Sequence, residues 1–191
     1  MTAPHLVFPG LVLRPFADTD ADAFAAAVVE SVASVSPWMG WCTSDYTAAD
    51  ALEWFAMCRA GQAAGTAFEF GIFDQQSGDF LGGAGLNDIR MLHRFCNLGY
   101  WVRQSRQGQG VASRCVQALA AHAFGALDLH RVEIVVAVGN AASLAVAAKS
   151  GALDERIARN RLCIDGRAVD AHVFSLISAH GAAPEYRVLP H

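Results

Sequence analysis

The fold is indicated most clearly by one stretch, Leu98-Gly99-Tyr100-Trp101-Val102-Arg103-Gln104-Ser105-Arg106-Gln107-Gly108-Gln109-Gly110-Val111-Ala112. An extended, apolar run ends near Arg103, two glycines follow, and an amphipathic pattern begins directly after them. Free N–H groups at a helix N-terminus favour an anion, and glycines let the backbone approach a phosphate. The stretch therefore favours an anion-binding turn between a strand and a helix, although a simple tight turn has the same glycine pattern.

The segments after this turn predict a βαβ unit. Val116, Leu119, Ala120, Ala123 and Leu127 recur at helical spacing, and residues 132–138 form a nearly continuous β-branched run typical of a strand buried on both faces. A right-handed crossover joins such strands. A short helix at 141–150 and two weaker strands near 153–158 and 169–177 complete this half.

The segments before the turn predict helices and an antiparallel meander. Residues 11–16 read as a strand and 21–35 as one helix that follows the cap-capable Asp18 and Asp20. A second helix begins at Thr47, with Leu52, Phe55 and Ala56 on one face. Residues 66–74 and 80–87 form a hairpin, and 97–103 add a third strand. The predicted fold class is α/β (α+β): one domain with a mixed central sheet, an antiparallel meander followed by βαβ, flanked by helices.

Composition excludes several functional classes. The 191 residues are 53% hydrophobic and 17% charged, with a net charge of −4 and no run of Lys or Arg, so we expect a folded chain with no nucleic-acid or membrane partner. Residues 1–10 lack the basic and apolar regions of a secretory signal, which predicts a cytoplasmic location. The five cysteines form no CxxC pair, and the seven histidines show no metal-ligand spacing, so no metal is expected.

Known phosphate-binding motifs fit the glycine turn unequally. No GK[ST] follows it, which excludes a Walker loop, and Ser113 stands where a dinucleotide fingerprint needs its third glycine. The pattern Q/R-x-x-G-x-G/A is met by Gln107, Gly110 and Ala112, and here the chain resembles the GCN5-related N-acetyltransferases (GNAT superfamily). Asn140-Ala-Ala-Ser143, followed by Lys149-Ser-Gly151-Ala152, is similar to a second segment of that superfamily.

Three further segments resemble the ribosomal-protein N-acetyltransferase (RimJ/RimL-like) branch: residues 98–102, residues 11–16 and Pro37-Trp38. The resemblance spans about residues 11–178, so 1–10 and 179–191 are expected to be terminal extensions of an N-acetyltransferase domain. It implies acetyl-CoA as cosubstrate, transfer to a primary amine by direct attack in a ternary complex, and a homodimer. The amine is expected to be a protein N-terminal α-amino group.

The resemblance also implies the binding residues. The pyrophosphate of the coenzyme would lie on the N–H groups of residues 109–112, and the thioester carbonyl would meet backbone N–H near Trp101, where neighbouring strands separate. Tyr100 and Trp101 alternate along one strand, so only one is expected to face the cleft. The expected coenzyme-binding residues are Trp101, Val102, Gln107, Gly108, Gln109, Gly110, Val111, Ala112, Asn140 and Ser143, and the expected acceptor-binding residues are Trp38, Trp41 and Tyr100.

Two catalytic residues are expected, Ser143 and Asp88. By resemblance, Ser143 would protonate the departing thiolate, while Asn140 also suits a helix N-cap. Many similar enzymes have a Glu on the strand before the glycine turn, but Asn97 lies there and cannot act as a base. Asp88, His93 and Glu69 are the substitutes, and Asp88 is taken as the base.

Two other functions remain open at this point. The acceptor could instead be a small-molecule amine, since fold does not select the acceptor. The absence of the usual Glu also allows a non-catalytic acyl-CoA-binding module, which would bind the coenzyme without turnover.

Overall fold

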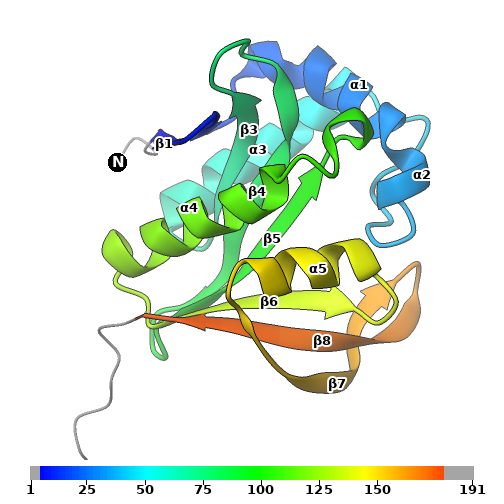
Figure 1. Cartoon of the computed structure of the whole chain (residues 1–191). Helices are drawn as coiled ribbons and strands as arrows, with labels where there is room; N and C mark the ends of the chain where they lie inside the picture. The colour runs from blue at the N-terminus through cyan, green and yellow to red at the C-terminus, as the bar shows by residue number, and fades with distance from the viewer. Residues whose placement is uncertain (1–4, 179–191) are drawn as a thin grey trace, which may run out of the picture.

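The predicted meander and βαβ unit join into one eight-stranded sheet in the computed structural model, which describes residues 5–178 (Figure 1). The strand order is β1-β2-β3-β4-β5-β6-β8-β7. The strands are β1 Leu6–Phe8, β2 Leu11–Arg14, β3 Phe68–Asp74, β4 Phe80–Arg90, β5 Phe95–Val102, β6 Arg131–Ala137, β7 Leu153–Ile164 and β8 Arg167–Ile177. The α-helices are α1 Ala21–Glu30, α2 Val32–Val35, α3 Ala48–Ala64, α4 Val111–Gly125 and α5 Ala141–Lys149.

The pair β5–β6 divides the sheet into two halves. It is parallel, whereas the other neighbouring pairs are antiparallel, and its register covers only Phe95–Asn97 against Arg131–Glu133. Beyond Asn97 the two strands separate, as predicted from the sequence. The central sheet therefore has an opening beside residues 98–102 of β5.

The sheet differs from the prediction in several ways. Burial along β6 alternates, because every second side chain faces the side opposite α5, so the strand is not buried on both faces. Strand β8 lies between β6 and β7. The hairpin β7–β8 is longer than expected, because Asp165 and Gly166, both at positive φ, form a tight turn. At the other edge, strand β1 lies inside the segment expected to be an extension and pairs with β2.

Two hydrophobic clusters lie on opposite faces of the sheet. The larger one joins α4 and α5 to the strands through side chains such as Leu98, Leu119 and Ile134. The second joins α1 and α3 to β3–β5 and is rich in aromatic rings: Phe16 stacks on Phe55 at 4.5 Å between centroids. Of the residues that the structure describes, those of β6, β7 and β8 do not belong to this second cluster.

The segment expected as one helix at 21–35 is broken at Ser31. The buried Ser31 hydroxyl donates to the carbonyl of Ala27 at 2.6 Å, which competes with continued helical hydrogen bonding, and the helix restarts as α2. Asp18 and Asp20 form a 3-10 turn rather than a simple cap, and Asp20 binds Arg14. The break turns α2 toward the glycine turn, which matters for the site.

Helix α3 begins as predicted, with the Thr47 hydroxyl accepting from the N–H of Asp50. Its buried face consists of Ala51, Phe55 and Cys58, so the expected placement of Leu52 and Ala56 on that face was wrong. Within residues 5–178, no helix has the length and apolar character needed to cross a membrane.

Candidate active site

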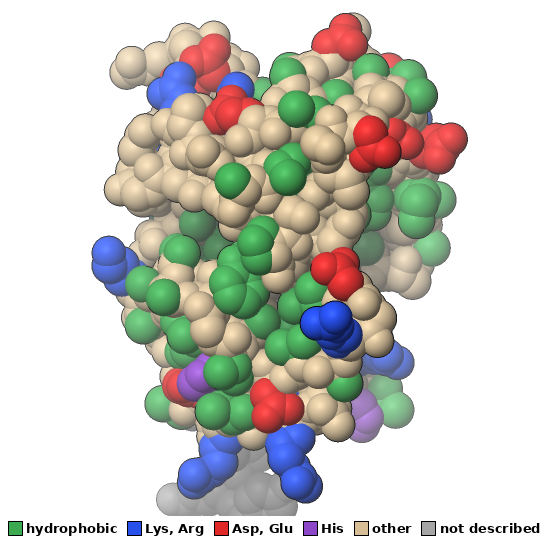
Figure 2. Space-filling view, turned by 90° about the vertical axis from the view of Figure 1, so that its right-hand side faces the viewer, with side chains coloured by type: hydrophobic (Ala, Val, Ile, Leu, Met, Phe, Trp, Pro, Cys, Tyr) green, Lys and Arg blue, Asp and Glu red, His purple; other side chains and the backbone are tan. Residues whose placement is uncertain are grey.

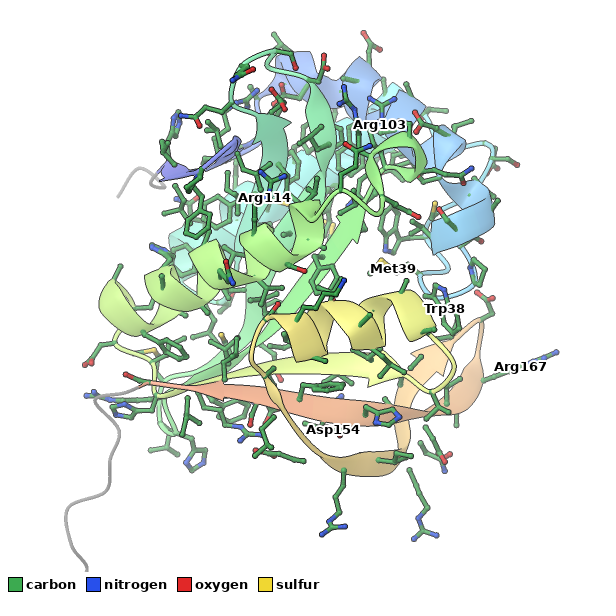
Figure 3. The ribbon with its side chains drawn as sticks, in the orientation of Figure 1. Trp38, Met39, Arg103, Arg114, Asp154 and Arg167 are labelled. Atoms are coloured by element: carbon green, nitrogen blue, oxygen red, sulfur yellow. The ribbon has the colours of Figure 1, made fainter. Side chains whose placement is uncertain are left out.

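A cleft with a volume of about 350 Å³ opens between β5, the glycine turn and α5. Figure 2 shows hydrophobic side chains gathered across the middle of the face on which this cleft lies. Trp38 and Met39, in the loop after α2, extend over the gap toward the end of α5 that follows β6 (Figure 3). We call this the coenzyme cleft, after the ligand that the sequence resemblance implies.

The glycine turn supplies an uncapped helix N-terminus to the cleft. Gly108 and Gly110 have φ values of 73° and 75°, which glycine adopts without strain, and Gly110 is the N-cap of α4. Among the described residues, no side chain caps the first turn of α4. The N–H groups that begin the helix are therefore available to a phosphate, and the residues present fit the pyrophosphate of a coenzyme.

Gln107 positions the turn. Its side-chain amide donates to the carbonyl of Val102 at 2.8 Å and to the hydroxyl of Ser34 at 3.0 Å, which ties the turn to β5 and α2. Gln109, in contrast, does not line the cleft, and its side chain donates to the carbonyl of Ser105. The predicted coenzyme residues Gly108, Gly110, Val111 and Ala112 all line it.

An ion pair and hydrogen bonds also hold α1 to residues 103–105, which precede the glycine turn. The carboxylate of Glu30 binds the guanidinium of Arg103 and accepts from the N–H of Ser105 at 2.8 Å. These hydrogen bonds lower the pKa of Glu30 to about 2, with Arg103 as the largest cause. The N–H of Gln104 donates to Ser31 at 3.0 Å, so the helix break described above serves as an anchor for this segment.

Tyr100 and Ser143 form a hydroxyl pair at the far wall of the coenzyme cleft. Their oxygen atoms lie 2.8 Å apart, and burial raises the pKa of Tyr100 to about 12. Asn140 caps α5 by accepting from the N–H of Ser143 at 3.1 Å. The Ser143 hydroxyl is therefore not the cap; it is hydrogen-bonded to Tyr100, and Ser143 lines the coenzyme cleft.

A second cavity of about 330 Å³ lies on the opposite face of the sheet, between β3–β5 and the helices α1 and α3. We call it the aromatic cavity, because its walls include Phe16, Phe24, Trp41, Tyr46, Trp54 and Trp101. Trp41 packs edge-on against Tyr46 and Trp101, with centroids 6.2 and 5.6 Å away. One acidic side chain of the described chain, Glu69, lines it.

The two cavities share Met39, Tyr100 and Trp101 as lining residues. Tyr100 packs with the cluster on the α4–α5 face and Trp101 with that on the α1–α3 face, which confirms that they point in opposite directions. As residues, both nevertheless line both cavities. Both residues lie in the part of β5 beyond Asn97, where the register with β6 has ended, and the two cavities adjoin there.

The structure does not bring every predicted site residue together. Asp88 lines neither cavity; it lies at a bulge with φ of 48° and binds Arg90. His93 lies in the exposed turn between β4 and β5. Trp41 lines the aromatic cavity alone, whereas Trp38 lines the coenzyme cleft. In the described part of the chain, no group of three or more His, Cys, Asp or Glu side chains is arranged to hold a metal ion.

Sequence reasoning missed how strand β4 accommodates the site. A Cβ at Gly83 would lie 2.7 Å from the indole nitrogen of Trp101, and one at Gly85 would overlap the carboxylate of Glu69. The glycines therefore let these two side chains lie flat across the strand. Three glycines within four residues of a predicted strand are a signal of such close approach.

Comparisons with known proteins agree with this geometry. Residues 10–153 match the model of the acetyltransferase (GNAT) domain. Two curated relatives come from Escherichia coli (strain K12): a ribosomal-protein-serine acetyltransferase, 36% identical over 46% of this chain and 48% of the relative, and a [ribosomal protein uS5]-alanine N-acetyltransferase, 30% identical over 63% and 62%. For most of its curated relatives the chain spans about half to two thirds of their length.

Among solved structures, Mycobacterium smegmatis RimJ in complex with a CoA-disulfide is similar, with a TM-score of 0.82 and 26% identity over 95% of this chain and 88% of that chain. An opened mixed sheet beside a glycine turn is thus the architecture of an acetyl-transferring enzyme. The chain belongs to the GNAT acetyltransferase family, and some of its relatives are named ribosomal-protein acetyltransferases.

Proposed function

We propose that this protein transfers the acetyl group of acetyl-CoA to a protein N-terminal α-amino group. The observation that carries the proposal is the meeting of two unlike cavities at Met39, Tyr100 and Trp101, where the sheet opens. One cavity suits a phosphate-bearing coenzyme and the other suits an acceptor. A transfer reaction needs both ligands at one point, which supports direct attack in a ternary complex.

The residues of the coenzyme cleft have separate tasks in this proposal. The N-terminal N–H groups of α4 bind the pyrophosphate, and Gln107 holds the turn that presents them. Alternate residues of β5 direct N–H groups toward the missing β6 neighbour, and there they stabilise negative charge on the thioester oxygen. Ser143, paired with Tyr100, supplies a proton to the departing thiolate.

The names of the Escherichia coli relatives support a ribosomal-protein N-terminus as acceptor. A small-molecule amine remains the alternative acceptor, and the small volume of the aromatic cavity, about 330 Å³, is the observation that favours it. Within the proposed function the cytoplasmic location and the homodimer stay predictions.

An acceptor panel tests the proposal. Purified protein and acetyl-CoA are incubated with peptides of varied N-termini, with the same peptides blocked at the N-terminus, and with small amines, while free thiol is measured. Thiol release that requires a free peptide α-amino group supports the proposal. Thiol release with small amines alone would show that the acceptor is a small-molecule amine. Coenzyme binding without any thiol release would indicate a non-catalytic module.

A further inference from the structure

Glu69 is a carboxylate without a counter-ion among the described residues, in a cavity lined mostly by aromatic side chains. It forms no ion pair in the described residues, and its Oε1 accepts a hydrogen bond from the Asn87 side-chain nitrogen at 3.2 Å. Burial raises the pKa of Glu69, only partly offset by Asn87. An unpaired carboxylate among aromatic rings is costly, and a cationic ligand would remove that cost.

A row of polar side chains across three strands fixes the carboxylate in place. Asn97 on β5 donates to the side-chain oxygen of Asn87 on β4 at 2.9 Å, which turns the Asn87 nitrogen toward Glu69 on β3. Asn97 therefore has a role although it cannot be a base itself. It orients the residue that holds Glu69.

Two paired glycines lie between Glu69 and the opening in the sheet. Glu69 pairs with Gly85, and Gly85 pairs with Gly99. Because neither glycine has a Cβ, the surface between Glu69 and β5 is clear, and Gly99 lines the aromatic cavity. A ligand group bound to Glu69 would thus lie on the side of the sheet opening where β5 has lost its β6 neighbour.

We infer that the aromatic cavity binds the acceptor as an α-ammonium ion, with Glu69 as its counter-ion and as the base that takes its first proton. This inference rests on the proposed function and adds the proton acceptor and the class of amine. The aromatic side chains of Trp41, Tyr46 and Trp54 line the same cavity, and aromatic rings favour a bound cation.

Two protons leave the acceptor nitrogen during the transfer. The ammonium gives one proton to Glu69, and the amine nitrogen then attacks the thioester carbon, so that a C–N bond forms and the C–S bond breaks. The second proton leaves the nitrogen to solvent as the amide forms. The Ser143–Tyr100 pair provides the proton of the departing thiolate, is restored by solvent, and Glu69 releases its own proton to solvent.

An α-amino group fits this base better than a lysine side chain. Its pKa is about 8, compared with about 10.4 for lysine, so proton transfer to a carboxylate is less unfavourable by a factor of about 10². The other titratable groups facing Glu69 stay neutral in the relevant range, since burial raises the pKa of Tyr46, Cys58 and Tyr100 to about 12 each. Glu69 is then the group in the cavity whose titration controls acceptor deprotonation.

The test is the pH dependence of kcat/KM for Glu69→Gln, with a peptide amide that has an N-terminal alanine as acceptor. At pH 7 we expect a loss of about 10²- to 10³-fold, and above about pH 9, where the peptide is already a free amine, the loss should shrink toward unity. Coenzyme affinity should not change. Glu53→Gln, at an exposed site on α3, is the matched control and should behave as wild type.

Thermal stability separates this role from a structural one. Because burial raises the pKa of Glu69 above its unfolded value, the charged form opposes folding: its stabilising effect exists at low pH and is lost as the pH rises through the folded pKa. Glu69→Gln should therefore melt at or above the wild-type temperature at pH 7. A lowered melting temperature, or an activity loss that is the same at every pH, would overturn the inference.

The inference and the proposed function can fail separately. If wild type acetylates the peptide and Glu69→Gln matches it at all pH values, the function stands and the inference is wrong. If wild type acetylates nothing, the function is wrong, and calorimetry then decides the inference. The free peptide should bind wild type in the presence of coenzyme A, whereas the N-acetylated peptide, and Glu69→Gln with either peptide, should show binding weakened tenfold or more; equal binding would overturn it.

Discussion

Gly110 is the residue on which coenzyme binding depends most directly. Its φ of 75° disfavours any side chain, and the space that a Cβ there would occupy is open, so a substitution meets no described protein atom but would meet a bound phosphate. Gly110→Val should lower acetyl-CoA affinity by at least about 10-fold in a calorimetric titration. The backbone cost should be about 1–2 kcal/mol of unfolding free energy.

Gly65 offers a matched control for this prediction. It has a φ of 70°, equally open surroundings and a position at the end of α3, and it lines neither cavity. Gly65→Val should therefore cost similar stability and leave coenzyme affinity unchanged. If both variants bound acetyl-CoA with equal affinity, the glycine turn would not be the phosphate-binding site.

Ser143 is predicted to act in chemistry rather than in helix stability. Since Asn140 provides the cap, Ser143→Ala should change the free energy of unfolding by less than about 1 kcal/mol. The loss of its hydroxyl removes the proton path shared with Tyr100, so kcat should fall about 10²-fold while coenzyme affinity is kept. Steady-state kinetics and a melting curve on one preparation measure both, and full activity would leave solvent as the proton donor.

At the scale of elements, the contact between α1 and the segment before the glycine turn should respond to acid. The pKa of Glu30 is lowered from 4.5 to about 2, so its stabilising effect is complete above pH 4.5 and is lost as the pH falls through about 2. Because Glu30 is half-buried and partly screened by solvent, Glu30→Gln should cost about 1–3 kcal/mol at neutral pH.

Urea unfolding at pH 7, 4 and 2.5 measures this effect. The difference between wild type and Glu30→Gln should decrease steadily toward the lowest pH, and Glu53→Gln on exposed α3 should show no such trend. A difference that persists at full size at pH 2.5 would show that Glu30 is not stabilised by Arg103.

Sequence patterns predicted those elements whose cause is local. The Thr47 cap, the β3–β4 hairpin turn and the glycine turn before α4 depend on residues within a few positions, and the structure confirms them. The break at Ser31 and the place of β8 between β6 and β7 depend on distant partners, such as Gln104 for Ser31. Local hydrophobic periodicity in the sequence therefore cannot predict them. The Glu69–Asn87–Asn97 row was missed for the same reason, because its members lie on three strands.

At the scale of the whole molecule, the homodimer is a prediction about the half of the sheet that α1 and α3 do not cover. Leu153 and Ile177 there are 68% and 72% exposed, and a second copy of the chain packed on this half would cover them. Sedimentation equilibrium at micromolar concentration should give about twice the chain mass of 20.3 kDa. A single species at the chain mass would contradict the dimer.

The glycines of β4 also affect how this protein can change over time. A methyl group at Gly85 would meet first the flexible end of the Glu69 side chain, which can move aside, so the chain could still fold while its acid–base behaviour changed. At Gly83 the same methyl group would press on an indole packed among other rings, which has much less room to yield. Two glycines on one face of the same strand thus differ in the effect of a substitution. A substitution at Gly85 would change the acid–base behaviour of the enzyme, whereas one at Gly83 would prevent folding and be removed by selection.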